Sequence, residues 1–147
     1  MKYNGGFLIS RIKQVHGRLL NNFLSCKNVR AFNAEQGRIL HILWAKENIS
    51  IKELSVQTGL AINTLTVMLE RMEQTGLIYK KSDERDRRKT LINLTEYAYS
   101  LKKEYSLISE EITEIFYKDF SDNEVEQFEI YLMRILKNLE NVNNCKK

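Results

Sequence analysis

The chain of 147 residues contains no proline and only six glycines. Tethers between domains are usually rich in proline, or in glycine and serine, and no such stretch is present. The composition therefore argues against separate domains joined by a linker and favours a single protomer over residues 1–147. With 43% hydrophobic residues, the chain has enough apolar side chains for a core of its own.

Long apolar runs are also missing, and no stretch approaches the ~20 residues that a membrane-spanning helix needs. The N-terminus lacks the apolar core of a secretion signal, so we expect a cytoplasmic protein without a membrane partner. The two cysteines, Cys26 and Cys145, lie far apart and make no disulfide framework. Because no C-x-x-C or H-x-x-x-H spacing occurs, we expect no metal site and no cofactor.

Motifs of enzymatic chemistry are missing as well. The sequence has no phosphate-binding glycine loop, no nucleophile elbow and no histidine in a recognisable catalytic arrangement. We therefore do not expect an enzyme. The net charge of +4 permits nucleic-acid binding but is modest, so the placement of the charge is more informative than its total.

The most informative stretch is residues 49–94. Ser50 and Glu53 have the spacing of a capping box, which predicts a short helix that ends at Gly59. Apolar residues then recur at spacings of four and three over residues 62–75, which predicts a second helix. Two helices joined by a tight turn are typical of a helix-turn-helix.

The second of these helices is expected to have one buried and one exposed face. Its apolar stripe consists of Leu65, Leu69 and Met72, and at about 100° per residue the opposite side is mostly polar. In a DNA major groove, asparagine pairs with adenine, threonine bonds a base or touches the thymine methyl, and valine offers that methyl only apolar contact. The candidate groove-facing residues are Asn63, Thr64, Thr66, Val67, Glu70 and Arg71.

Residues 77–81 and 90–94 favour β-structure and flank a polar segment, which predicts a hairpin, with Ile49 and Ser50 as a candidate third strand. Basic residues outnumber acidic ones in the intervening KKSDERDRRKT. An ordinary solvated turn is one interpretation of this charge run. A basic hairpin directly after a helix-turn-helix is also where a DNA-binding wing stands, with guanidinium groups that enter a minor groove. The candidate wing residues are Arg85, Asp86, Arg87, Arg88 and Lys89.

Both ends of the chain carry amphipathic helices. Apolar residues alternate at spacings of four and three over residues 7–24, again over a long helix that Thr95 is placed to cap, and again over residues 125–142. Part of each stripe is expected to form intramolecular core. The surplus apolar surface favours a second copy of the chain in a C2 dimer.

The predicted helices also indicate where the DNA-binding and dimerisation regions begin and end. A capping box at Asn33 and Gln36 opens a DNA-binding lobe over residues 33–94. We expect helical dimerisation regions over residues 1–30 and 95–147.

The residues resemble the MarR-type transcriptional regulators, homodimeric winged-helix proteins that mostly repress transcription and respond to small molecules or oxidants. GLAINTLTVMLERMEQTGLI is similar to the family's recognition helix, and DERDRRKTLINLT is similar to its wing and the start of the next helix. The NTLT run resembles the organic-hydroperoxide-sensing branch. The implied fold class is mainly α with a small β-hairpin: a winged helix-turn-helix with N- and C-terminal dimerisation helices.

By position, the resemblance implies that Asp86 braces the wing, that Arg88 and Arg87 reach the minor groove, and that Arg85 contacts a phosphate. It also implies that a small organic effector binds at a hinge between the dimerisation region and the DNA-binding lobe. The candidate residues there are His16, His41, Trp44, Tyr97 and Tyr99. A lone histidine on a helix is more often structural, so both interpretations of each histidine stay open.

Cys26 is a candidate redox residue because Lys27 and Arg30 follow it, and cations favour the reactive thiolate. Oxidant-sensing relatives carry their cysteine near the start of this helix, whereas Cys26 comes late. The sequence leaves open whether Cys26 or Cys145 has a redox role.

We therefore predict a homodimer that binds a pseudo-palindromic site on double-stranded DNA, represses transcription and is released by an effector. The operator, the effector and the choice between repression and activation are not encoded in any recognisable pattern. The alternative is a helical self-associating module whose basic hairpin docks an acidic protein or RNA. Only DNA reading predicts a base preference together with a steep salt dependence.

Overall fold

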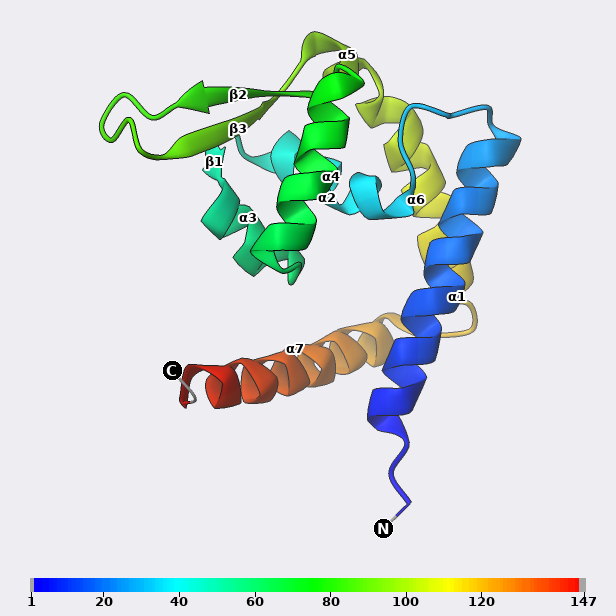
Figure 1. The fold of residues 1–147 in the computed structure, drawn as a ribbon. Coiled ribbons are helices and arrows are strands. Elements are labelled where there is room, and N and C mark those ends of the chain that lie inside the picture. The colour runs from blue at the N-terminus through cyan, green and yellow to red at the C-terminus, as the bar shows by residue number, and fades with distance from the viewer. Residues whose placement is uncertain (1, 146–147) are drawn as a thin grey trace. The chain divides into compact units, whose positions relative to one another are not determined.

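The computed structural model describes residues 2–145, with side chains described up to residue 142. Cys145, whose redox role the sequence leaves open, therefore has its side chain outside the described part. The chain divides into two compact units, Met1–Glu110 and Glu111–Lys147. Helices dominate both, and one small antiparallel sheet lies in the first unit (Figure 1). The predicted fold class, mainly α with a small β-hairpin, is confirmed.

The first unit contains residues 33–94, for which the sequence predicts a DNA-binding lobe. Its elements are, in order, α1 (Gly5–Cys26), α2 (Ala34–Ala45), β1 (Ile49–Ser50), α3 (Ile51–Thr58), α4 (Ile62–Gln74), β2 (Ile78–Ser82), β3 (Thr90–Leu94), α5 (Glu96–Ser100) and most of α6 (Lys102–Phe116). The second unit contains the end of α6 and α7 (Asp122–Cys145).

Helices α3 and α4 form the predicted helix-turn-helix. Ser50 caps α3, because its Oγ accepts the Glu53 N–H at 3.1 Å. Gly59 ends α3 in the left-handed region with φ 74°, and Gly76 with φ 77° follows α4. The predicted capping box is half formed, because the Glu53 carboxylate accepts from Lys46 Nζ at 2.7 Å.

The sheet has the strand order β1-β3-β2, with both pairs antiparallel. The hairpin register runs from Ile78 opposite Leu94 to Ser82 opposite Thr90. Strand β1 pairs with β3 through Ile49 and Ile92, so the predicted third strand is confirmed. The wing hairpin is thus attached on one side to the strand that leads into α3.

The core of the first unit lies between the helices and this sheet. The predicted stripe of α4 is fully buried, and α4 packs against α3 and β2. Residues with at most 1% exposure include Ile39, Leu40, Leu43, Ile49, Leu54, Leu65, Leu69, Met72, Leu77 and Ile92. Since burial of such side chains stabilises by roughly 1.5–3 kcal/mol each, this cluster holds α4 and the wing on one scaffold.

The long helix predicted from Thr95 onward is interrupted, and this expectation was wrong. Thr95 does cap α5, since its Oγ1 accepts the Ala98 N–H at 3.2 Å. The interruption falls at Leu101, whose N–H donates to the Ala98 carbonyl at 3.2 Å in a tighter turn. Ser100 Oγ donates to the Tyr97 carbonyl at 2.6 Å, and this is the acceptor that a regular helix would offer to Leu101.

In the second unit, α7 begins with a complete capping box. The Ser121 N–H donates to Glu124 Oε2 at 2.8 Å, and Ser121 Oγ accepts the Glu124 N–H at 3.3 Å. Aromatic rings cluster beside this start, with Phe128 of α7 between 6.3 and 6.5 Å from its neighbours. The rings in contact are Phe116, Tyr117, Phe120 and Phe128. The cluster packs the end of α6 and the residues that follow it against the first half of α7.

Candidate nucleic-acid interface

The outer face of α4 presents the residues that the sequence predicted for base reading. Asn63, Thr64 and Arg71 are exposed, and Val67 is 49% exposed. Thr66 is half-buried, and its hydroxyl donates to the Ile62 carbonyl at 2.8 Å. Thr66 therefore offers a partner its methyl group and an acceptor oxygen, while its proton is held by the helix.

Two hydroxyl groups at the end of α3 bond to Leu60 in the turn before α4. Ser55 Oγ donates to the Leu60 carbonyl at 2.6 Å. Thr58 Oγ1 donates to the Leu54 carbonyl at 2.7 Å and accepts the Leu60 N–H at 3.2 Å. Neither bond to Leu60 was predicted from the sequence, although small hydroxyl residues in the last turn of a helix are suited to such bonds.

Asp86 and Arg88 form a brace within the wing. Asp86 Oδ1 accepts the Arg88 N–H at 3.1 Å and Arg88 Nε at 3.0 Å, and Oδ2 accepts Arg88 Nη2 at 3.4 Å. These hydrogen bonds to Arg88, first that of its side chain and then that of its backbone, lower the pKa of Asp86. The Arg88 side chain is 91% exposed, so the brace aims the guanidinium while leaving it accessible.

The rest of the wing tip is held by backbone groups. The Asp83 N–H donates to the Lys89 carbonyl at 3.0 Å, and the Lys89 N–H donates to the Asp86 carbonyl at 2.9 Å. Asp83 Oδ1 accepts the Arg85 N–H at 2.9 Å. Two of the acidic residues thus fold the tip, while the side chains of Arg85 and Lys89 are exposed.

Arg87 has different surroundings from the other basic residues of the wing. It is exposed, and it lines a shallow hollow of about 340 Å³ with Ser82, Asp83 and Glu84. Part of its charge is therefore opposed by local carboxylates. The geometry makes Arg88 the better oriented of the two arginines predicted to enter a groove.

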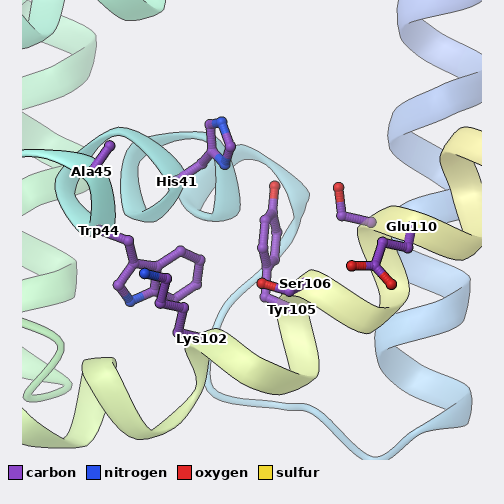
Figure 2. Close-up of a pocket in the computed structure, with 8 residues that line it drawn as sticks. His41, Trp44, Ala45, Lys102, Tyr105, Ser106 and Glu110 are labelled. Atoms are coloured by element: carbon purple, nitrogen blue, oxygen red, sulfur yellow. The ribbon is translucent and has the colours of Figure 1, made fainter.

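A second cavity, of about 300 Å³, lies between α2 and α6 (Figure 2). Two predicted effector residues, His41 and Trp44, line it. The Tyr105 ring lies 5.1 Å from that of Trp44 and 6.3 Å from that of His41. The full lining is His41, Trp44, Ala45, Lys102, Tyr105, Ser106, Ser109 and Glu110.

The other predicted effector residues are not part of this lining. His16 lies exposed on α1, and Tyr97 on α5 is 51% exposed. The Tyr99 hydroxyl donates to Glu47 Oε1 at 2.9 Å. The sequence analysis did not assign Lys102 or Tyr105 to the cavity, because their side of α6 is defined only by its packing on α2.

A glycine explains how closely the two helices approach. A Cβ atom at Gly37 of α2 would lie 2.9 Å from Tyr105 Cε2, so glycine makes room for this ring. Burial raises the pKa of Tyr105, and the charge of Arg38 partly opposes the effect. The cavity therefore combines aromatic walls with a neutral phenol and an ammonium group, which suits a small aromatic molecule with a polar substituent.

The remaining candidate, Cys26, is the last residue of α1 and an exposed free thiol. It does not line the cavity between α2 and α6. Among the described residues, no group of three or more His, Cys, Asp or Glu side chains is placed to hold a metal ion. In the same part of the chain, every helix is too short or too polar to cross a bilayer.

Comparison with known proteins relates this geometry to one family. The sequence model of the MarR family matches residues 32–90. The organic hydroperoxide resistance transcriptional regulator of Bacillus subtilis (strain 168) is 47% identical over 64 residues, which are 44% of either chain. The HTH-type transcriptional regulator MgrA of Staphylococcus aureus is 27% identical over 121 residues, 81% of either chain.

A solved structure has the same fold over most of the chain. Mutant MarR from E. coli, complexed with operator DNA, superposes with a TM-score of 0.79 at 26% identity. The alignment covers 89% of this chain and 92% of that one. The predicted winged helix-turn-helix is thereby confirmed. The matched segment, the fold and the regulators to which the chain is similar all agree with the resemblance to the MarR-type transcriptional regulators.

Proposed function

We propose that this protein represses transcription as a homodimer bound to a pseudo-palindromic DNA operator. The α4 face with Asn63 and Val67 enters the major groove, and the wing brings Arg88 to the adjacent minor groove. The observation that carries the proposal is the Asp86–Arg88 brace, because it fixes the guanidinium of a 91% exposed side chain on a narrow hairpin. A charge left to a random solvated turn would need no such brace.

Apolar surface on the terminal helices supports the dimer. On α1, Leu8, Ile12 and Val15 are between 42% and 51% exposed at helical spacing. On α7, Met133, Leu136 and Leu139 are between 48% and 64% exposed. Contiguous apolar faces of this kind mark association surfaces. A C2 dimer would present its two α4 helices to half-sites about 34–36 Å apart.

The cavity between α2 and α6 is the proposed effector site, and its aromatic walls and Lys102 suit a small organic molecule. Release of the operator needs a coupling free energy of only ~1–3 kcal/mol between the two sites. An oxidant is a second candidate effector. It is supported by the exposed Cys26 thiol and by a relative named for organic hydroperoxide resistance.

The direct test is selection of bound duplexes from a random pool, followed by binding at increasing salt. The proposal expects an enriched symmetric sequence and a steep loss of affinity with salt. Arg88→Ala should weaken binding to the selected duplex about tenfold. Binding without base preference would support the rival function, a self-associating module whose basic hairpin docks an acidic protein or RNA.

The thiol has its own test. Peroxide should weaken duplex binding by the reduced wild-type protein and leave Cys26→Ser unaffected. Equal affinity before and after peroxide treatment of the wild type would remove the oxidant from the proposal.

A further inference from the structure

The loop between α2 and β1 is bonded to three different elements by three consecutive side chains. Lys46 bonds to α3, Glu47 to α5 and Asn48 to β3. Of these elements, α3 packs against α4, and β3 is a strand of the wing hairpin that α5 contacts. We call residues 44–48 the connector, because Trp44 at its start also lines the cavity between α2 and α6.

The tightest part of the connector is a reciprocal amide pair. The Asn48 N–H donates to Asn93 Oδ1 at 3.0 Å, and Asn93 Nδ2 donates to Asn48 Oδ1 at 3.0 Å. Asn93 is only 5% exposed, and it stands on β3, the strand that returns from the wing tip. Asn48 has a left-handed backbone with φ 55°, so the loop turns sharply to make both bonds.

Two further bonds flank the amide pair. Lys46 Nζ lies 2.7 Å from Glu53 Oε1 on α3. The Tyr99 hydroxyl on α5 donates to Glu47 Oε1 at 2.9 Å. Since the partners lie on separate elements, the loop is unable to shift without breaking bonds to at least one of them.

At its other end the connector reaches the cavity wall. The Trp44 indole N–H donates to the Ala98 carbonyl on α5 at 3.1 Å, and its ring packs against Tyr105. A molecule that displaces the Trp44 ring would therefore pull on α5 and on residues 46–48 together. The path from the cavity wall to the base of the wing is only four residues long.

We propose that the connector positions the wing relative to α3 and couples it to the wall of the cavity, with Asn48 and Asn93 as the positioning pair. The inference rests on the proposed function, because the wing must bind DNA for its position to matter. By linkage, DNA bound at the wing changes the affinity of the cavity for an occupant by the same factor by which that occupant changes DNA affinity. We therefore expect DNA binding to alter the surroundings of Trp44 in the cavity wall.

Trp44 is the only tryptophan in the chain, so its emission reports on the cavity wall alone. The probe is the duplex selected from the random pool, added to the full chain with excitation at 295 nm. The wild type should show a change in Trp44 emission that saturates with DNA binding. Asn48→Gly keeps the left-handed backbone and deletes the amide, so it should bind the duplex more weakly and lose the emission change.

Asn28→Gly is the matched control, because Asn28 also has a left-handed backbone, with φ 57°, and lies outside the connector. It should respond to DNA as the wild type does. A double-mutant cycle measures whether the effect of Arg88→Ala on duplex affinity depends on Asn48. A connector that served only the stability of the fold would leave that effect unchanged. Arg88→Ala should cost about tenfold in affinity in the wild type and less than about threefold in Asn48→Gly.

Each outcome decides the matter. Duplex binding without an emission change in the wild type would overturn the connector and leave the proposed function standing. An undiminished emission change and Arg88 effect in Asn48→Gly would overturn it as well. If Asn48→Gly does not fold, Tyr99→Phe removes the bond to Glu47 and should reduce the same two signals. Failure to bind any duplex would overturn both proposals.

Discussion

Acidic and basic side chains have separate tasks in the wing. Asp83 and Asp86 accept hydrogen bonds from backbone N–H groups of the tip and so fold it. The arginines they support point outward. Asp83 and Asp86 are only partly exposed, so the acidic residues of the wing offset less of its positive surface than their number suggests.

This division of tasks predicts opposite effects for two changes that remove one negative charge each. Asp86→Asn should weaken duplex binding several-fold, because the charge-assisted bonds to Arg88 are lost. Glu84→Gln should strengthen binding slightly, because it removes repulsion from phosphate and deletes no bond that folds the tip. Fluorescence anisotropy with a labelled duplex measures both. Stronger binding by Asp86→Asn would show that the brace has no positioning role.

The buried phenol of Tyr105 should make the folded protein less stable at alkaline pH. Burial raises its pKa above the usual 10.0, so the folded state favours the neutral phenol. This contribution is fully present below pH 10.0 and is lost as the pH rises through the raised pKa. As the pH rises above 10, the melting temperature of Tyr105→Phe should therefore fall less than that of the wild type. Tyr97→Phe, at an exposed tyrosine, is the control and should behave as the wild type does. Identical slopes in all three proteins would contradict the assignment.

At the scale of elements, local bonds explain which helices the sequence could predict. The capping box predicted at Asn33 is complete in the structure, as is the one at Ser121, and each helix starts directly after its capping residue. The interruption at Leu101 was not predictable from apolar spacing, because the stripe continues across it. We attribute it to Ser100, whose hydroxyl bonds to the Tyr97 carbonyl that Leu101 would use in a regular helix.

Ser100→Ala tests this explanation. Without the hydroxyl, the Leu101 N–H should bond to the Tyr97 carbonyl, so that α5 and α6 merge into one helix. Amide hydrogen exchange at Leu101 should slow severalfold. Unchanged exchange would mean that packing, rather than Ser100, interrupts the helix.

Only part of the lining of the cavity between α2 and α6 could be predicted from the sequence. The resemblance grouped His41 and Trp44 with other candidates, and in the structure these two line one cavity. Lys102 was not among the candidates, since its neighbourhood depends on how closely α6 approaches α2. That approach is set by Gly37, which leaves space for a ring more than sixty residues away in the chain. The wing was predictable for the opposite reason, because its bonds join residues close in sequence.

Binding to a pseudo-palindromic operator requires two copies of the whole molecule. Ile12→Glu places a charge in the exposed apolar face of α1, so it should shift the protein towards monomers and weaken duplex binding at least tenfold. Gln14→Glu adds the same charge to an exposed polar position of α1 and should remain dimeric. Sedimentation velocity measures the change. A dimer that survives Ile12→Glu unaltered would place the interface elsewhere.

The most direct test of paired reading is the spacing of the half-sites. In the selected duplex, an insertion of about five base pairs rotates one half-site to the opposite side of the helix, and about ten base pairs restores its direction. Two α4 helices held at a fixed distance predict a loss of at least tenfold in affinity with the shorter insertion. Equal affinity for the original and the half-turn duplex would contradict DNA reading by a rigid dimer.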